Sequence, residues 1–307
     1  MIPFLYFALA DTVIVEPPDE MVSVHEWGVI ELDESQAGAV GVPDGYVDAE
    51  QYYHQGEEMQ VRAPVVWFHG AECSGIFSVE LRNGCFDELM PNPDSIAHLA
   101  IPGVEGSDVV IAFWRDLKLV EEQIPIDGMQ GASLDGGPFQ LDCFTYAVPM
   151  WRDVPAHYVL HPGGQYQDRF IYYESSMSLP SALSGEYYNC QGEALVFFAD
   201  DDKLACVRGD PAAEMDLDGY RLANEDVLST LCDWGDNQLE SEEVLALWRT
   251  WRPVLRTRCE LEGETVILFP LTPEQEDVVS KIEFVPDEDW VDVRYERLLL
   301  GLGTVNL

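Results

Sequence analysis

Alternating apolar and polar positions dominate the first two thirds of the chain. Such alternation predicts β-strands, because successive side chains of a strand point to opposite faces of a sheet. Short continuous apolar runs such as residues 63–69 predict strands that are buried on both faces. Together, the predicted strands cover residues 22–32, 63–69, 76–81, 85–90, 109–114, 139–148, 157–160, 169–174, 194–199 and 204–207. Residues 33–60 follow no sustained period and predict a long loop. Short strands separated by Gly, Pro and Asp are typical of an antiparallel β-sandwich or a barrel-like fold.

One turn signal within this region predicts a specific strand pairing. Asn83 and Gly84 have the sequence of a two-residue hairpin turn, so residues 76–81 and 85–90 are expected to pair. That register places Cys85 beside the turn and far from Cys73. These two cysteines are therefore not expected to form a disulfide bond with each other.

The pattern changes to a helical period after about residue 220. Asn224 is the predicted N-cap of a helix that ends at Gly235, and Ser241 is the predicted N-cap of a second helix that Pro253 closes. The connection is short, so the two helices are expected to form an antiparallel hairpin.

The C-terminal part then returns to strands. Residues 265–270 and 290–299 read as strands, and Thr272 and Gln275 have the capping-box spacing of a short helix between them. We therefore predict a mainly β fold, with an antiparallel β-sandwich or barrel-like domain at residues 11–207. A smaller α+β region with the helical hairpin follows at residues 208–307, either on its own or packed on the same core.

Composition narrows the class of protein. A chain of 307 residues with 47% hydrophobic and 11% aromatic residues can bury a sizeable core. The 57 acidic and 16 basic residues give a net charge of -41, and the acidic excess is spread along the chain. This charge indicates a solvated surface suited to solubility or a salty medium, or alternatively a role in binding divalent cations. It excludes nucleic acid as an expected partner, since few basic residues are available to neutralise phosphates.

The N-terminal residues and the cysteines indicate the cellular compartment in which the protein is expected. Residues 1–10 are apolar and finish in Ala8-Leu9-Ala10, which resembles the end of a secretory signal peptide; a buried first strand is the alternative. Nothing else approaches the length of a membrane-spanning helix. An oxidising compartment with disulfide bonds is indicated by seven cysteines: Cys73, Cys85, Cys143, Cys190, Cys206, Cys232 and Cys259. We expect a protein that is secreted, periplasmic or at the cell surface.

Several segments also resemble a family of predicted secreted proteins from planctomycetes and myxobacteria with no known activity. The matching segments, in chain order, are His25-Glu26-Trp27-Gly28, Pro64-Val65-Val66-Trp67-Phe68, His157-Tyr158, Arg169-Phe170-Ile171-Tyr172-Tyr173, Trp248-Arg249 and Thr265-Val266-Ile267-Leu268. Val29 stands where the family is expected to have threonine. The resemblance implies secretion and a shared fold, and it supplies no catalytic residue.

His25 and Glu26 are the first candidates for chemistry. They are adjacent, so on a strand they point to opposite faces and cannot serve one site without a bulge. His25 is either a metal ligand or general base, or a hydrogen-bonded histidine beside a packed Trp27. In the second interpretation Gly28 is small because another backbone approaches closely.

Two other groups have metal-ligand spacing. His157 and His161 return to one face of a strand or helix, and His69, His98 or Glu174 would complete a zinc set. Glu214, Asp216, Asp218 and Glu225 occupy the first, third, fifth and twelfth positions of an EF-hand calcium loop, with Gly219 at the sixth. The alternative for the loop is a turn that leads into the following helix.

The sequence does not decide whether the protein is an enzyme. The first hypothesis is a secreted acidic β-rich protein with a binding or structural role, an extracellular or cell-surface partner, and stabilisation by disulfide bonds and calcium. The alternative is a metal-dependent hydrolase that uses a histidine cluster, with Glu26 or Glu174 as general base.

Overall fold

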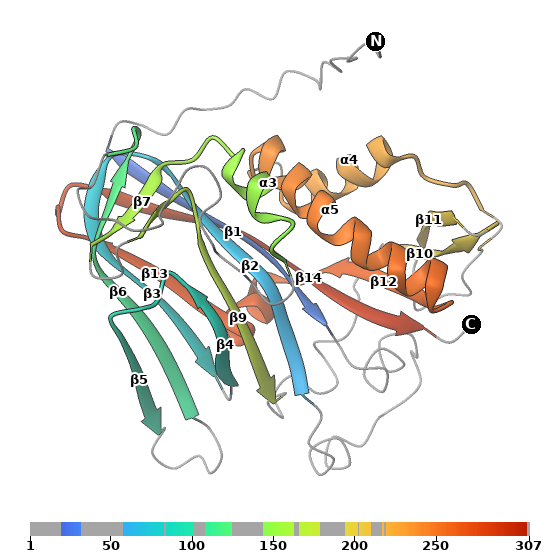
Figure 1. Cartoon of the computed structure of the whole chain (residues 1–307), viewed down its shortest axis with the longest axis horizontal. Helices are drawn as coiled ribbons and strands as arrows, with labels where there is room; N and C mark the ends of the chain where they lie inside the picture. Colours follow the sequence, from blue (N-terminus) through green and yellow to red (C-terminus); the bar gives the residue numbers. More distant parts are fainter. Residues whose placement is uncertain are drawn as a thin grey trace.

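The computed structural model describes residues 20–31, 58–82, 84–100, 108–124, 144–162, 166–178, 194–201, 203–209, 217, 219–236 and 238–305. The described chain is mainly β and contains two large sheets, with helices gathered along one side (Figure 1). The predicted mainly β fold class is confirmed.

The larger sheet, sheet A, has eight strands and carries the chain's first strand near its centre. Its strand order is β11 (Lys203–Gly209), β10 (Ala194–Asp200), β12 (Thr265–Pro270), β14 (Asp292–Val305), β1 (Met21–Glu31), β2 (Glu58–Gly70), β9 (Ile171–Ser178) and β4 (Gly84–Met90). Strand β1 pairs antiparallel with β2 and parallel with β14. The first and last strands of the described chain are therefore neighbours.

The second sheet, sheet B, packs against one face of sheet A. Its order is β13 (Ser280–Pro286), β3 (Cys73–Arg82), β6 (Asp108–Val120), β7 (Tyr158–His161) and β8 (Tyr166–Asp168), and β5 (Ser95–Ala100) also pairs with β6. The C-terminal region contributes strands to both sheets, because β12 and β14 belong to sheet A and β13 belongs to sheet B. The sequence pattern does not predict strands β5, β8 and β13.

Helices cover the opposite face of sheet A (Figure 1). They are α3 (Val148–Arg152), α4 (Asn224–Trp234) and α5 (Ser241–Arg256), followed by a π-helical turn, η2 (Thr257–Leu261); a short α6 (Pro273–Val279) precedes β13. Helices α4 and α5 follow each other closely and both bury apolar side chains in one core. Helix α5 continues past Pro253, so the prediction that this proline closes the helix is wrong.

The alternation of β1 divides its side chains between two cores. Trp27 and Val29 face the helices and belong to the helix-side core, where α5 contributes Trp248 and Trp251. Val22 and Val24 face sheet B and belong to the sandwich core. Each large apolar side chain buried in this way stabilises the fold by about 1.5–3 kcal/mol. Sheet A is thus the middle layer, and both of its faces are covered.

Two sequence predictions about local structure are wrong. Strands β3 and β4, on either side of Asn83, do not form a hairpin: β3 pairs with β6 and β13 in sheet B, whereas β4 pairs with β9 in sheet A. The chain therefore crosses from sheet B to sheet A between these two strands. The predicted strand at 139–148 is also wrong in its described part, where residues 144–147 form a turn before α3.

The helix caps follow the predictions to within one residue. Thr272 Oγ1 accepts a hydrogen bond from the Gln275 backbone N–H, and Gln275 Oε1 accepts one from the Thr272 N–H, so the predicted capping box is confirmed. The N-caps of α4 and α5 are Ala223 and Glu240, one residue before the predicted positions. In α5 the capping contact is made by the Glu243 side chain, which accepts a hydrogen bond from the Glu240 backbone N–H.

Candidate metal centre

The site is built on the face of β1 that points toward α5. Residues 23, 25 and 27 share this face, while Glu26 points to the sandwich side. The predicted separation of His25 and Glu26 is therefore confirmed. Gly28 sits at a bulge between β1 and β2, and a Cβ there would lie 3.1 Å from Pro64 Cα. The predicted close backbone approach at Gly28 is confirmed as well.

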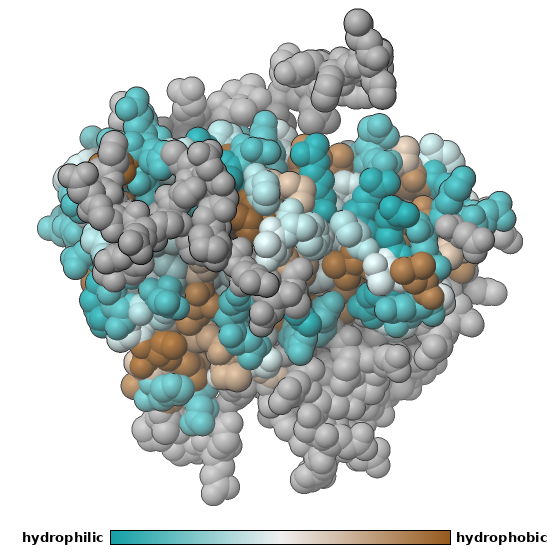
Figure 2. All heavy atoms as spheres, in the orientation of Figure 1, coloured by the Kyte–Doolittle hydropathy of each residue, from teal (hydrophilic) through white to brown (hydrophobic). Residues whose placement is uncertain are grey.

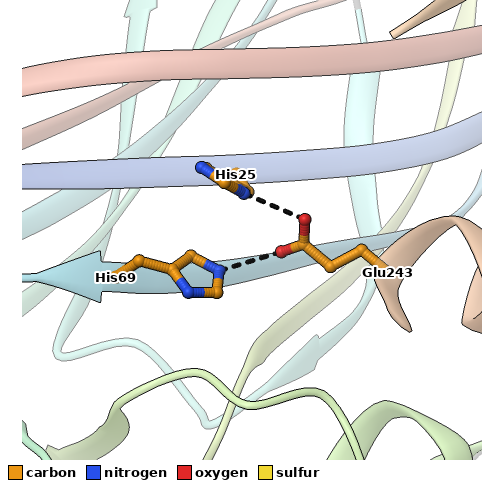
Figure 3. A group of neighbouring side chains, drawn as sticks. All are labelled: His25, His69 and Glu243. Atoms are coloured by element: carbon orange, nitrogen blue, oxygen red, sulfur yellow. Dashed lines mark hydrogen bonds and ion pairs between the residues drawn. The ribbon is translucent and has the colours of Figure 1, made fainter. Parts of the chain in front are cut away.

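Three side chains from three elements meet on this face (Figure 3). His25 lies on β1, His69 lies near the end of β2, and Glu243 extends from the start of α5 so that its carboxylate lies at the edge of both imidazole rings. His25 Nδ1 lies 2.9 Å from Glu243 Oε2, and His69 Nε2 lies 3.0 Å from Glu243 Oε1. The ring centroids of the two histidines are 4.4 Å apart. One carboxylate therefore bridges two imidazoles.

Helix geometry fixes the position of Glu243. It is the third residue of the first turn of α5, and its Oε2 accepts a hydrogen bond from the Glu240 backbone N–H at 2.7 Å. An acidic side chain at this position satisfies an unpaired donor and interacts favourably with the helix dipole. The Glu243 side chain is fully buried, and the exposed fractions of the His25 and His69 side chains are 6% and 13%. The carboxylate is thus held rigidly at the joint between helix and sheet.

Electrostatics keep Glu243 ionised despite its burial. Burial alone would raise the pKa of Glu243, but the charge of His25 and hydrogen bonds from His25 and His69 lower that pKa to about 2. Burial would lower the pKa of His25, yet the Glu243 carboxylate, with the charges of Glu240 and Glu296, raises it above 6.5. Both shifts agree on a carboxylate facing a protonated imidazole. Without a metal ion, the pair is an ion pair.

A further hydrogen bond orients His25. Its Nε2 lies 2.8 Å from Ser23 Oγ, two residues earlier on the same face of β1. Histidines that bind metals through one ring nitrogen commonly use the other to donate to a nearby group, which fixes the tautomer and the ring plane. Ser23 therefore leaves Nδ1 as the nitrogen directed at Glu243.

The three residues have the chemistry of a transition-metal site. Two imidazole nitrogens and a carboxylate oxygen are ligands typical of zinc, and these atoms all lie within 4.8 Å of one another. Around a tetrahedral zinc with bonds of about 2.0–2.1 Å, neighbouring ligand atoms are roughly 3.3 Å apart. The contacts at 2.9 and 3.0 Å are close to that spacing. The two nitrogens contact different oxygens of the carboxylate, and the three ligand atoms lie within 4.8 Å of one another, so the side chains must shift for one ion to contact all three.

The histidine pair predicted from spacing is not brought together as a site. His157 Nε2 lies 2.6 Å from the Gly70 carbonyl oxygen, and His161 Nε2 lies 3.0 Å from Asp94 Oδ2. Within the described part of the chain, neither belongs to a group of three potential ligands. Of the proposed third ligands, His69 joins His25 instead, and His98 is exposed on β5.

Glu26 and Glu174 are separate from this cluster. Glu26 is buried on the sandwich side, where Arg297 Nε lies 2.6 Å from its Oε2 and Tyr173 donates its hydroxyl proton to Oε1 at 2.6 Å. Glu174 is buried on β9 near Arg62, and burial raises its pKa. The structure thus places neither carboxylate beside a histidine cluster, as the general-base hypothesis would require.

The calcium-loop prediction falls mostly outside the described residues. Glu214, Asp216 and Asp218 belong to that outside part, and Glu225 lies in the first turn of α4. The apolar residues 1–10 are also outside it.

The described cysteines are free thiols. Cys73, Cys206 and Cys259 are buried, Cys232 is partly buried, and Cys85 is exposed on β4. Burial raises the pKa of the Cys73 and Cys259 thiols to about 12, which keeps these groups protonated and unreactive. The predicted disulfide bonds are therefore not formed among these five residues, and Cys143 and Cys190 lie outside the described chain.

Two members of the cluster had weak sequence signals. His69 ends an apolar strand, and in the sequence it is a candidate only as a third ligand for His157 and His161. Glu243 carries no distinguishing sequence signal, because an acidic residue in the first turn of a helix is common. The position of Glu243 in a capping box is the one sequence feature that bears on the site. It predicts that the carboxylate folds back toward the backbone at the start of the helix.

Among the described residues, no helix is long and apolar enough to cross a membrane.

The chain was compared with known protein families, curated proteins and solved structures. No family model matches the chain, and no curated protein matches it. A comparison with solved structures finds the Fcho1 Mu homology domain of Danio rerio with bound Eps15 peptide, at 9% identity, over 93% of this chain and 97% of that chain, with a TM-score of 0.22. A TM-score of this size does not establish a common fold.

Proposed function

We propose that the protein binds a divalent transition-metal ion of the zinc type through His25, His69 and Glu243. The observation that carries this proposal is the convergence of two imidazoles and one carboxylate, from β1, β2 and α5, within 4.8 Å. The ion replaces the proton that His25 shares with Glu243, so that both histidines bind as neutral ligands.

The charge around the cluster supports a divalent cation. With both imidazoles neutral, the carboxylates of Glu240, Glu243, Glu296 and Asp236 outnumber the guanidinium of Arg294, which acts on Glu296. This excess of negative charge favours a cation. A buried cluster with excess charge is costly, so the ion would relieve repulsion as well as form bonds.

The position of the site supports a structural role. The ion would link the start of α5 to the two central strands β1 and β2, which are also joined by apolar packing and the two imidazole–carboxylate contacts. Glu243 is fully buried and His25 nearly so, which suits a staple between layers. We accordingly propose that the metal stabilises a binding or structural protein.

A metal-dependent hydrolase is the second candidate function. Zinc sites with three protein ligands keep a fourth position for water, which is the arrangement of catalytic zinc. The 13% exposure of the His69 side chain is the observation that favours this candidate. In this alternative, His69 lies on the side from which water and substrate would approach.

Location and calcium binding are proposed from the sequence. The apolar residues 1–10 and the acidic composition support secretion, with an extracellular or cell-surface partner, and so does the resemblance to the His-Glu-Trp-Gly family. Calcium at Glu214, Asp216, Asp218 and Glu225 is a separate proposal, supported by the spacing of these carboxylates. The five free thiols give no support to disulfide stabilisation.

Elemental analysis of the purified protein tests the metal proposal. The protein is stripped with EDTA, reloaded with zinc or calcium, and measured for bound metal and thermal stability. We expect one zinc per chain and a melting point that rises on reloading; at 100 times the Kd, the ion adds about 2.7 kcal/mol to the free energy of unfolding. Calcium that binds without competing with zinc would support the EF-hand-like loop.

Matched variants localise the site. His69→Ala should abolish stoichiometric zinc binding, because it removes one of three ligands. His98→Ala removes an exposed histidine of β5 and should leave binding unchanged. If the His69 and His98 variants bind zinc equally, the metal does not occupy this cluster. Hydrolysis of a panel of ester and peptide substrates by the wild-type zinc protein, lost in His69→Ala, would favour the second candidate.

A further inference from the structure

Glu296 lies beside His25 on the neighbouring strand. Strand β14 runs parallel to β1, and the register pairs His25 with Glu296 directly. Adjacent strands are about 4.8 Å apart, so side chains on the same face at this position are in reach of each other. Residues 298 and 300 of β14 belong to the helix-side core, which places Glu296 on the same face as His25.

The surroundings of Glu296 are unusual for a glutamate. Its side chain is 12% exposed, and its carboxylate contacts Arg294, two residues earlier on the same face. Arg294 is 56% exposed and also contacts Gln238 in the connection before α5. An ion pair with such an exposed arginine contributes little stability, so Glu296 can exchange it for another partner at small cost.

Resting on the proposed metal site, we propose that Glu296 is the fourth ligand of the ion. In the metal-free structure its carboxylate is outside the group formed by His25, His69 and Glu243; it turns from Arg294 toward His25 when the metal binds, and Arg294 remains in solvent. Four protein ligands, two imidazoles and two carboxylates, then close the coordination sphere. Closed four-ligand sites are structural, whereas catalytic sites keep an open position. The inference therefore assigns the ion a structural role and leaves no place for a reacting water.

Glu240 is the competing carboxylate and serves as the control. It also acts on the charge of His25, and more strongly than Glu296 does. However, Glu240 is the N-cap of α5, and its backbone N–H is bound to Glu243. Removing its charge tests electrostatic attraction alone, because the cross-strand position next to His25 belongs to Glu296.

Cobalt substitution tests this inference. Co²⁺ takes the place of zinc, and its visible absorption reports the coordination number and the entry of added azide at an open position. We expect wild-type protein to bind one Co²⁺ with a spectrum that azide does not change. Glu296→Gln removes a ligand, so it should weaken Co²⁺ binding by more than the roughly 10–100-fold that loss of an outer-shell partner costs, and it should make the spectrum respond to azide. Glu240→Gln should weaken binding much less and remain insensitive to azide.

The outcomes separate this inference from the metal proposal. Failure of the wild-type protein to bind Co²⁺ or zinc would overturn both. One bound Co²⁺ with an azide-sensitive wild-type spectrum, or equal effects of Glu296→Gln and Glu240→Gln, would overturn the role of Glu296 and leave the three-residue site. Glu296→Asp provides a second test if Glu296→Gln does not fold. It keeps the negative charge but shortens the side chain, so the carboxylate no longer reaches the ion. An azide-sensitive spectrum for Glu296→Asp would therefore support ligation by Glu296.

Discussion

Adjacent residues of β1 anchor two buried charged clusters on opposite faces of sheet A, and the clusters differ in how their charge is balanced. On the sandwich side, Glu26 meets Arg297, and Tyr173 and Ser280 complete the hydrogen bonds. On the helix side, Glu243 is held between two imidazoles with further carboxylates nearby.

The difference concerns the cation that each cluster needs. Arg297 is always charged and contacts Glu26 directly, so this buried carboxylate has a permanent cationic partner within the chain. On the helix side, the groups that contact the Glu243 side chain across the layers are histidines, whose charge depends on protons, and the nearby Arg294 is 56% exposed and contacts Glu296. A buried charge without a fixed partner is more typical of a site that binds something than of one that only stabilises the fold.

The largest expected effect is on the sandwich side. Arg297→Met removes the partner of the fully buried Glu26 and leaves an uncompensated charge. We expect a loss of about 3–5 kcal/mol in the free energy of unfolding, measured by urea denaturation. The loss should be the same with zinc and with EDTA, because this face holds no metal ligand. A loss that depends on metal would contradict the separation of the two clusters.

Glu243→Gln tests the other face. It keeps the size of the side chain and removes the charge that both histidines face. In the wild-type protein, zinc at 100 times the Kd should add about 2.7 kcal/mol relative to EDTA. In the variant this metal-dependent difference should disappear, as measured by thermal melts at both conditions. An unchanged difference would mean that the metal binds elsewhere.

The sandwich side also contains a titrating group. Burial raises the pKa of Glu276 to about 7, although the Arg297 charge opposes this shift. A raised pKa means that the folded state holds the proton more tightly than the unfolded chain, whose pKa is about 4.5. The free energy of unfolding should therefore fall as pH rises from about 4.5 to about 7, and stay level above that.

Glu276→Gln should remove this decline. The neutral amide can still accept the hydrogen bond that the Leu299 N–H donates to Oε1. We expect the variant to be more stable than wild type by about 1–3 kcal/mol above pH 7 and equal to it near pH 4. Urea denaturation across this range measures the effect. Parallel curves for the two proteins would show that Glu276 does not titrate with folding.

The smallest expected effect comes from Ser23. Ser23→Ala removes the hydrogen bond to His25 Nε2 but keeps every proposed ligand. We expect zinc affinity to fall about 10-fold, with little change in stability in EDTA. A competition titration with a zinc indicator measures the change. An affinity equal to that of wild type would show that Ser23 does not orient the ring for metal binding.

Local pattern was sufficient for several features of β1 and of the helices. The alternation of residues 22–32 correctly placed His25 and Glu26 on opposite faces, because the strand period of two is a property of the backbone. The capping box at Thr272 and the helix end at Gly235 were also predicted correctly. In each case, the interacting groups lie within a few residues of each other.

Only the tertiary structure decided the pairings and the site. Asn83 and Gly84 carry a hairpin signal, yet β3 and β4 join different sheets, because apolar surface from distant strands competes with the local turn. The site requires β2 to pair with β1 and α5 to dock over both. His69 and Glu243 are 174 residues apart in the chain, and His25 and Glu243 are 218 apart. No periodicity extends over such separations, because they are set by how the layers bury their apolar faces together.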